Sequence, residues 1–168
     1  MQVRYLRNDT IYTVNISANT SYDTGSSSAI SILSATQLGF IEYGELITRA
    51  GSSMTRTISN TASGADIVIK GNSYSGGVDW AYIKIKCEKR TRINMTASSE
   101  SSYDLGYVCE MPLTTKAAIT ATALGYVSGT SAQQVIVDAG FEGYIGYTKD
   151  GSTVANSDKI TFEIEVPE

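Results

Sequence analysis

The amino-acid sequence predicts an all-β protein composed of two tandem, closely packed antiparallel β-sandwich repeats. Apolar and polar residues alternate along many short segments, as they do in strands that bury one face. Ser, Thr, Gly and Tyr are abundant, Pro is scarce and 18% of the residues are charged, a composition that suits short strands joined by turns. Two blocks of sequence also occur twice in the same order, which predicts an internal duplication.

The two duplicated blocks lie at similar positions in each half of the chain. Residues 17–25 align without a gap on residues 98–106, and both copies contain Tyr-Asp-x-Gly. Residues 70–79 align on residues 149–158, and these copies share a Lys, a Ser and an Asp. The duplication therefore predicts two units of related structure.

We expect the first repeat to span residues 1–89. Its strands are recognised by alternation with a period of two and are separated by turns rich in Gly, Ser and Asn. Residues 38–43 and 45–48, joined at Gly44, are predicted to form a hairpin or a bent strand. The other predicted strands are residues 3–6, 10–17, 29–33, 54–59, 66–70 and 80–87.

We expect the second repeat to span residues 90–168. Residues 116–123 are ambiguous, because their alanines permit a helix while Ile and Thr favour a strand, and we predict a strand. The junction at residues 86–92 contains neither Pro nor Gly, so we expect close packing; whether the repeats share one core stays open. The other predicted strands are residues 92–97, 107–111, 133–138, 143–148 and 159–166.

Residue types that serve common chemistries are missing from the chain. It has no histidine, which removes the most frequent general base and every His metal ligand. It also has no Cys-x-x-Cys motif and no Gly-rich phosphate loop. What remains for catalysis is a carboxylate pair, Asp104 with Asp158 or Asp138 with Glu142, of the kind that hydrolyses glycosidic bonds. We predict that the protein is not an enzyme.

Charge and hydropathy exclude further classes of partner. A net charge of -4 without a Lys/Arg cluster argues against nucleic-acid binding. No segment approaches the roughly 20 apolar residues of a membrane helix, so we expect no membrane insertion. The N-terminal residues lack the apolar core of a signal peptide, so we expect retention in the producing cell or removal of a leader. Cys87 and Cys109 are either a bridge between the repeats or two free thiols.

Three acidic residues form a candidate calcium site. Calcium binds carboxylate, carbonyl and water oxygens. Glu100 and Asp104 belong to the second Tyr-Asp block and Asp158 ends the second aligned loop, so the three converge if both loops lie at one end of the sandwich. The first copy has Asn19 in place of Glu100. The alternative is purely structural, because Asp can close an Asx turn and Gly supplies a permissive φ.

Aromatic residues form a second candidate site. We expect Trp80, Tyr107 and Tyr147 to contribute to a ligand surface on which a sugar can stack. Rings in alternating strands usually belong to the core, so packing in the core or at its rim is the alternative; Trp80 begins a strand and is expected to be half exposed. The residues considered for the platform are Trp80, Tyr82, Tyr107, Tyr126, Tyr144 and Tyr147.

Residues 99–104, 147–152 and 158–164 resemble β-sandwich repeats of surface and phage-encoded proteins of gut bacteria. Those repeats contain a Ser-Glu-Ser-x-Tyr-Asp stretch, a Tyr-x-Lys-Asp-x-Ser loop and a last strand that begins with Asp. The resemblance covers mostly residues 91–166 and implies a role in interaction or assembly. Residues 98–108 show a weaker likeness to CUB-type and related jelly-roll adhesion modules, although the cysteine pattern of those modules is missing.

Two functions follow as hypotheses. The first is a non-enzymatic structural or accessory protein of a bacteriophage virion, in the form of a capsid decoration, head-fibre or tail component that contacts other virion proteins or copies of itself. The alternative is a secreted or cell-surface adhesion or carbohydrate-binding module, which binds a glycan or host-surface ligand either without a cofactor or with Ca2+.

Overall fold

The computed structural model describes residues 2–7, 10–15, 34–71, 77–99, 101–150 and 158–167. The chain divides into two compact units, Met1–Ile32 and Leu33–Glu168. In the first unit, β1 (Gln2–Arg7) and β2 (Thr10–Asn15) form a two-stranded antiparallel sheet. The strand predicted at residues 29–33 and the first Tyr-Asp block lie outside the described residues.

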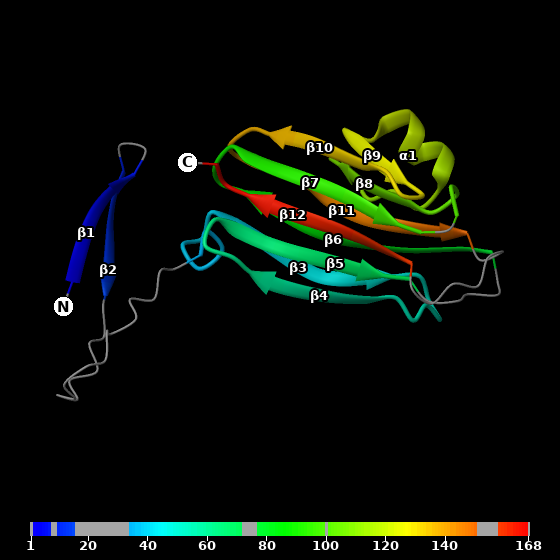
Figure 1. Cartoon of the computed structure of the whole chain (residues 1–168), viewed down its shortest axis with the longest axis horizontal. Coiled ribbons are helices and arrows are strands. Elements are labelled where there is room, and N and C mark those ends of the chain that lie inside the picture. The colour runs from blue at the N-terminus through cyan, green and yellow to red at the C-terminus, as the bar shows by residue number, and fades with distance from the viewer. Residues whose placement is uncertain are drawn as a thin grey trace. The chain divides into compact units, whose positions relative to one another are not determined.

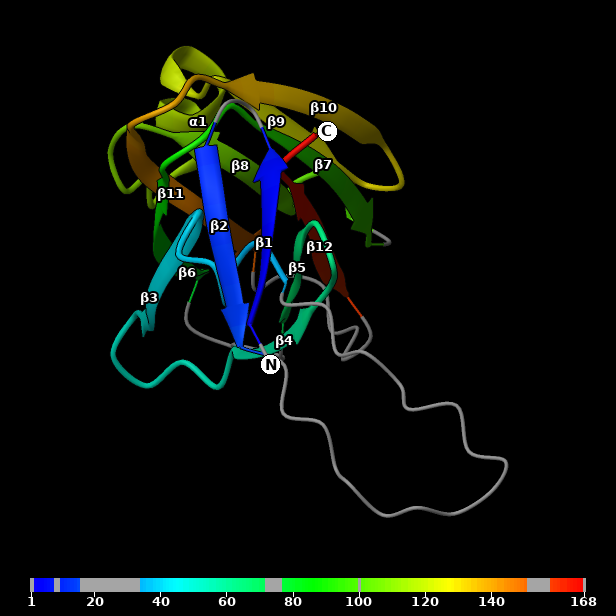
Figure 2. The same ribbon diagram turned by 90° about the vertical axis from the view of Figure 1, so that its left-hand side faces the viewer.

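The second unit is a sandwich of two five-stranded antiparallel sheets (Figure 1). Its elements are β3 (Ile41–Thr48), β4 (Thr55–Asn60), β5 (Gly64–Lys70), β6 (Val78–Cys87), β7 (Thr91–Ser98), β8 (Leu105–Cys109), α1 (Lys116–Thr122), β9 (Gly125–Ser128), β10 (Ala132–Val137), β11 (Phe141–Asp150) and β12 (Lys159–Glu165). The first sheet has the strand order β10-β7-β12-β5-β4, and the second sheet has the order β3-β6-β11-β8-β9. Figure 2 shows the two sheets as separate layers.

The two halves of the sequence share one core, instead of forming the two tandem sandwiches expected at residues 1–89 and 90–168. In the first sheet β5 pairs with β12, and in the second sheet β6 pairs with β11. Each sheet therefore contains strands from both halves. Alternation along a strand indicates which residues face a core, but not which strand lies beside which, because neighbours are chosen by long-range pairing.

The core between the sheets consists of the inward-facing residues of both layers. A glycine makes room for a side chain of the facing sheet: a Cβ at Gly106 of β8 would lie 2.4 Å from Ile160 Cγ2 of β12, so a larger residue would have to displace that side chain. Large apolar side chains fill the remaining space, as in other face-to-face sheet packings. Those that are fully buried include Ile67, Ile69, Ile83, Ile85, Ile93, Met95, Ile145, Ile160, Phe162 and Ile164.

The strand predicted at residues 116–123 was wrong, because this segment forms helix α1. The Thr115 side chain caps the helix by accepting a hydrogen bond from the Ala118 backbone N–H at 3.3 Å. Both edges of β8 are already paired, one with β11 and the other with β9, so no ladder position beside β8 is open to this segment. Within the described part of the chain, no helix has the length and hydropathy needed to span a membrane.

Cys87 and Cys109 are both buried free thiols. Cys87 lies in β6 opposite Phe141 and Cys109 lies in β8 opposite Tyr144, so β11 separates the two cysteines. Burial raises the pKa of the Cys87 thiol. Of the two alternatives left open by the sequence, the structure contains the unbridged pair.

Candidate functional site

The outer face of the second sheet carries three aromatic side chains on neighbouring strands. Ile83 of β6 and Ile145 of β11 lie opposite each other and are fully buried between the sheets. Because side chains alternate along a strand, Trp80 and Tyr82 of β6 and Tyr144 of β11 project from the outer face. All three are partly exposed. We call these three residues the aromatic ridge.

The rings of the aromatic ridge contact one another. The ring centroids of Trp80 and Tyr82 are 5.6 Å apart with an interplanar angle of 10°, which is a stacked pair. The centroids of Tyr82 and Tyr144 are also 5.6 Å apart, but at 86° they form an edge-to-face pair. Both geometries are favourable for aromatic rings. These contacts restrict the rotamers of the three side chains, so the ridge is an ordered apolar surface before any ligand binds.

A polar hollow adjoins the aromatic ridge. Lys84, which lines the hollow, is the cross-strand partner of Tyr144, so the hollow begins where the ridge ends. On its other side the pairing of β3 with β6 shifts register between Tyr43 and Leu46, and such a bulge bends the strand locally. The hollow has a volume of about 280 Å³ and is lined by Glu42, Tyr43, Gly44, Lys84, Ile85, Lys86 and Glu142.

Charged side chains give the hollow its hydrogen-bonding capacity. Lys84 Nζ donates to Glu142 Oε2 at 3.0 Å, and about half of each side chain is exposed. This hydrogen bond and the opposite charge raise the pKa of Lys84 and lower the pKa of Glu142. Lys86 is paired in the same way with Glu88, whose hydrogen bond and charge raise the pKa of Lys86. Exposed ion pairs of this kind contribute little to stability, so these groups can exchange partners with a ligand.

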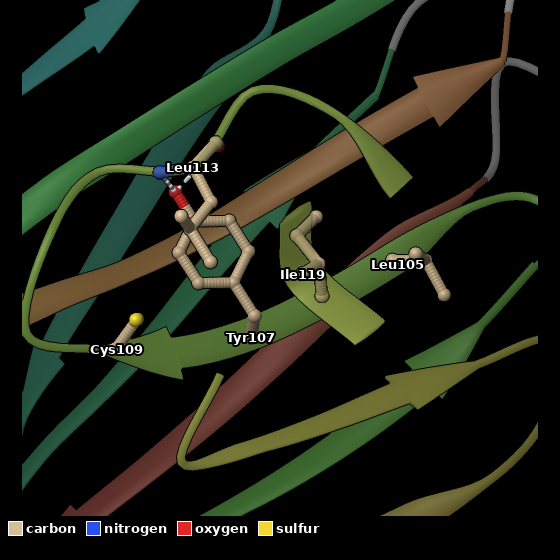
Figure 3. Packing of buried hydrophobic residues seen from close by; sticks show 5 residues of the cluster. All are labelled: Leu105, Tyr107, Cys109, Leu113 and Ile119. Atoms are coloured by element: carbon tan, nitrogen blue, oxygen red, sulfur yellow. Dashed lines mark hydrogen bonds between the residues drawn. The ribbon is translucent and has the colours of Figure 1, made fainter. Parts of the chain in front are cut away.

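The other half of the same outer face is covered. Residues 110–124, which include α1, lie across β8 and pack on its outward side chains (Figure 3). Tyr107 Oη donates to Leu113 O at 2.8 Å and accepts from Leu113 N at 2.9 Å. Burial raises the pKa of Tyr107 well above its usual value, and the hydrogen bond to Leu113 offsets only part of this. The buried cluster consists of Leu105, Tyr107, Cys109, Leu113 and Ile119.

A buried polar cluster lies inside the sandwich, where β11 ends and β12 begins. Lys149 and Asp104 are fully buried and Asp158 is 2% exposed. Lys149 Nζ is 2.5 Å from Asp158 Oδ2 and 3.6 Å from Asp104 Oδ2. Tyr147 Oη and Ser99 Oγ donate to the same Asp104 oxygen at 3.0 Å and 2.8 Å. Burial and the negative charge of Asp104 raise the pKa of Tyr147. We call these five residues the end cluster.

The end cluster contains two of the three residues expected to bind calcium. Asp104 and Asp158 do converge at one end of the sandwich, but the ammonium group of Lys149 contacts both carboxylates. Glu100, the third expected ligand, lies outside the described residues. Among the residues that the structure describes, no group of three or more acidic or Cys side chains is placed to hold a metal ion. The calcium site stays a prediction.

Only one of the three residues selected for the ligand surface lies on the open part of the sheet. Trp80 belongs to the aromatic ridge, whereas Tyr107 and Tyr147 are fully buried, which corrects the expectation for these two. Tyr107 is covered by residues 110–124, and Tyr147 faces inward and contributes to the end cluster.

Sequence reasoning did not single out Tyr82 and Tyr144 among the aromatic residues. Their signal is the alternation that places Trp80, Tyr82 and Lys84 on one face of β6. The alternation alone could not show that this face is exposed. In the described part of the sandwich unit, no segment packs over β6 and β11 as residues 110–124 pack over β8. Lys149 was also missed, and its signal is the alternation that places it on the same face of β11 as Ile145 and Tyr147.

Comparisons of structure find carbohydrate-binding modules. The chain is similar to the module CBM6cm-2 of lichenase 5A from Cellvibrio mixtus, solved with cellotriose, at 13% identity over 74% of this chain and 98% of that one (TM-score 0.33). It is similar to the family 11 module of Clostridium thermocellum, solved with a mixed-linked tetrasaccharide, at 7% identity over 73% and 85% (TM-score 0.35). The low-affinity xylan-binding module CBM86 of Roseburia intestinalis matches at 9% identity over 72% and 95% (TM-score 0.30).

Comparisons of sequence find no relatives. No family model matches the chain, and no curated protein matches it. The identities and TM-scores of the structural matches are too low to decide the function of this chain. Its function therefore has to be argued from its own surface.

Proposed function

We propose that this chain is a non-catalytic carbohydrate-binding module whose ligand lies on the open half of the second sheet's outer face. The observation that carries the proposal is the aromatic ridge, which is partly exposed and continues into the polar hollow. We call the ridge and the hollow together the open face.

The two parts of the open face match the two kinds of surface on a sugar. A pyranose ring presents C–H groups on its faces, which pack on aromatic rings, and hydroxyl groups around its edge, which need donors and acceptors. The rings of Trp80, Tyr82 and Tyr144 supply the first kind of contact. Lys84 and Glu142 supply a donor and an acceptor next to Tyr144.

The shape of the open face favours a glycan chain over a small enclosed ligand. The hollow of about 280 Å³ lies just below the range of roughly 300–1,000 Å³ that is usual for pockets enclosing a small molecule. The ridge extends the contact surface along β6 and β11 beyond the hollow. A chain of several sugar units can therefore contact both parts at once.

Binding without catalysis is supported by the position of the carboxylates. Asp104 and Asp158, one of the two pairs considered for glycoside hydrolysis, are buried in the end cluster between the sheets and do not reach the open face. The other pair is divided between two hollows, because Glu142 lines the hollow of the open face and Asp138 lines a different one. The hypothesis of a virion structural protein has no support in the structure or in the comparisons. A carbohydrate-binding role corresponds to the extracellular or cell-surface alternative.

The proposal is tested by calorimetric titration of the whole chain with soluble polysaccharides: a mixed-linkage β-glucan, a mannan and a xylan. We expect at least one to bind. Trp80→Ala and Tyr144→Ala should each weaken that binding about tenfold or more, which corresponds to about 1.4 kcal/mol. The matched control is Tyr103→Ala, which removes a tyrosine that is 56% exposed and lies outside the open face. It should leave the affinity unchanged.

Two outcomes would contradict the proposal: failure to bind any polysaccharide in the panel, or wild-type affinity in both ridge variants. Thermal melting of each variant confirms that a lost affinity is not a lost fold. Repeating the titration with a chelator tests the calcium prediction separately, because a requirement for calcium abolishes binding without any change in the ridge.

A further inference from the structure

The end cluster brings an amine of one sheet against a carboxylate of the other. Lys149 is one residue from the end of β11 in the second sheet, and Asp158 immediately precedes β12 in the first sheet. Lys149 Nζ lies 2.5 Å from Asp158 Oδ2. An oxygen at this distance places its carboxyl carbon at about 3–3.5 Å from the amine nitrogen, which is the range of near-attack geometries.

A second carboxylate stands beside the same amine. Asp104 Oδ2 is 3.6 Å from Lys149 Nζ, and its position is held by the hydroxyl groups of Tyr147 and Ser99. A carboxylate at this position can take a proton from the nitrogen and return it to a leaving oxygen. The cluster thus combines a nucleophile, an acyl group and a proton carrier.

We propose that Lys149 and Asp158 condense to an intramolecular isopeptide bond, with Asp104 as the proton carrier. One proton passes from the Lys149 ammonium to the Asp158 carboxylate, which gives a neutral amine and a carboxylic acid. The nitrogen attacks Cγ of Asp158, and the N–C bond forms. The surplus proton on nitrogen passes to Asp104, which delivers it to the leaving hydroxyl group. The C–O bond breaks, one water is released, and Asp104 ends unchanged.

Burial favours the product. The ion pair places charges in a site that water does not reach, where charged groups carry a large desolvation cost. Condensation removes two of these charges and replaces them with a neutral amide, while the charge that stays on Asp104 keeps the hydrogen bonds from Tyr147 and Ser99. The fold holds the reactants together, so the reaction is intramolecular and its effective concentration is high.

The aligned lysine of the first half has no such arrangement and serves as the matched control. Lys70, the counterpart of Lys149, is exposed. Asp79, the counterpart of Asp158, lies opposite Lys149 in the pairing of β6 with β11, and its carboxylate accepts hydrogen bonds from Ser52 Oγ at 2.8 Å and from the Trp80 backbone N–H at 2.9 Å. The cross-link is therefore expected in the second half only.

The test is mass spectrometry of the purified, folded chain after denaturation, followed by peptide mapping. The wild-type mass should be about 18 Da below the sequence mass, which is one water. Proteolysis should yield a branched peptide that joins Lys149 to Asp158. Lys149→Arg, Asp158→Ala and Asp104→Asn should each have the full mass for their sequence. Lys70→Arg should retain the loss.

A competing source of water loss lies next to Lys149. Asp150 precedes Gly151, and such a pair can cyclise on its own backbone to a succinimide with the same mass change. That reaction does not need Lys149, yields no branched peptide and is reversed at mildly alkaline pH. Retention of the loss in Lys149→Arg overturns the proposal, and so does a full wild-type mass. Neither result depends on glycan binding, so the test is independent of the proposed function.

Discussion

The covered and the open half of the second sheet's outer face differ in what lies over them, not in the type of side chain. Tyr107 of β8 and Tyr82 of β6 both project from this face, and both lie opposite Gly146 of the intervening strand β11. Tyr107 is fully buried beneath residues 110–124, whereas Tyr82 is partly exposed in the aromatic ridge. The same residue type is therefore core in one strand and surface two strands away.

Gly146 marks the boundary between the two halves. A Cβ at this position would lie 2.3 Å from the Tyr107 ring carbon Cζ, so the glycine allows that ring to lie across β11. A short covering segment therefore decides which aromatic residues stabilise the fold and which remain available to a ligand. Variants on either side of Gly146 test this division.

The largest expected effect is that of Tyr107→Ala. Removing a fully buried ring leaves a cavity under residues 110–124. The backbone N–H and carbonyl group of Leu113 also lose their hydrogen bonds to the Tyr107 hydroxyl group. We expect a loss of about 3–5 kcal/mol in the free energy of unfolding, measured with denaturant. Tyr82→Ala in the open half should cost about 1 kcal/mol or less. Equal losses in the two variants would abolish the distinction between the halves.

Gly146→Ala should have the next largest effect. The added methyl group must displace a buried, hydrogen-bonded ring, which is overpacking and costs about 1–3 kcal/mol. The control is Gly44→Ala in β3, where the nearest atoms are at 3.7 Å, an ordinary contact distance. Denaturant unfolding should show a clear loss for the first variant and little change for the second. A stable Gly146→Ala protein would show that the Tyr107 ring is free to move.

Alkaline pH should destabilise the fold through its buried tyrosines. The pKa values of Tyr107 and Tyr147 are raised in the folded protein, chiefly by burial, so the folded state keeps both protons after the unfolded state releases them. Their contribution to stability is complete below the unfolded pKa of about 10 and declines above it, by up to about 1.4 kcal/mol per pH unit for each residue. Unfolding measured across this range should show a shallower decline in Tyr107→Phe. An unchanged slope in that variant would rule out a contribution from Tyr107.

The smallest expected effect is a gain in stability. Thr148 is opposite Trp80 on one side and Leu105 on the other, and its buried Oγ1 has no hydrogen-bond partner among the described residues. Thr148→Val keeps the shape and removes the unsatisfied group, so we expect a gain of about 1 kcal/mol. Thr91→Val is the control, because Thr91 Oγ1 donates a hydrogen bond to Lys89 O at 2.8 Å. Loss of this hydrogen bond should destabilise the fold. A loss in Thr148→Val would indicate a partner for its hydroxyl.

Many strands were predictable from local sequence. The predicted strands at residues 92–97, 133–138 and 159–166 correspond to β7, β10 and β12 within one or two residues at each end. Each of these strands has one buried face, and the alternation of apolar and polar residues along the sequence indicates which face that is. Helix α1 was missed because its own residues are compatible with either a helix or a strand. In the folded chain β8 already pairs with β11 and β9, so no position beside β8 is left for this segment as a strand.

The candidate sites were predictable only in part. Trp80 was expected at a rim and lies on the open face, and Asp104 and Asp158 were expected to converge and do so. The aligned Lys70 and Lys149 look alike in sequence, yet one is exposed and the other is fully buried. The difference arises because Lys70 follows the buried Ile69 and lies on the outer face of β5, whereas Lys149 lies on the same inward face of β11 as Tyr147.

The all-β class, the positions of many strands and the face that each strand buries follow from local sequence, because these properties depend on residues close to one another in the chain. The tertiary structure alone decided that the two halves share one core, that residues 110–124 cover Tyr107 while Tyr82 stays open, and that Lys149 meets two carboxylates. These outcomes depend on which strands become neighbours, and the free energy of that choice comes from contacts between residues distant in sequence.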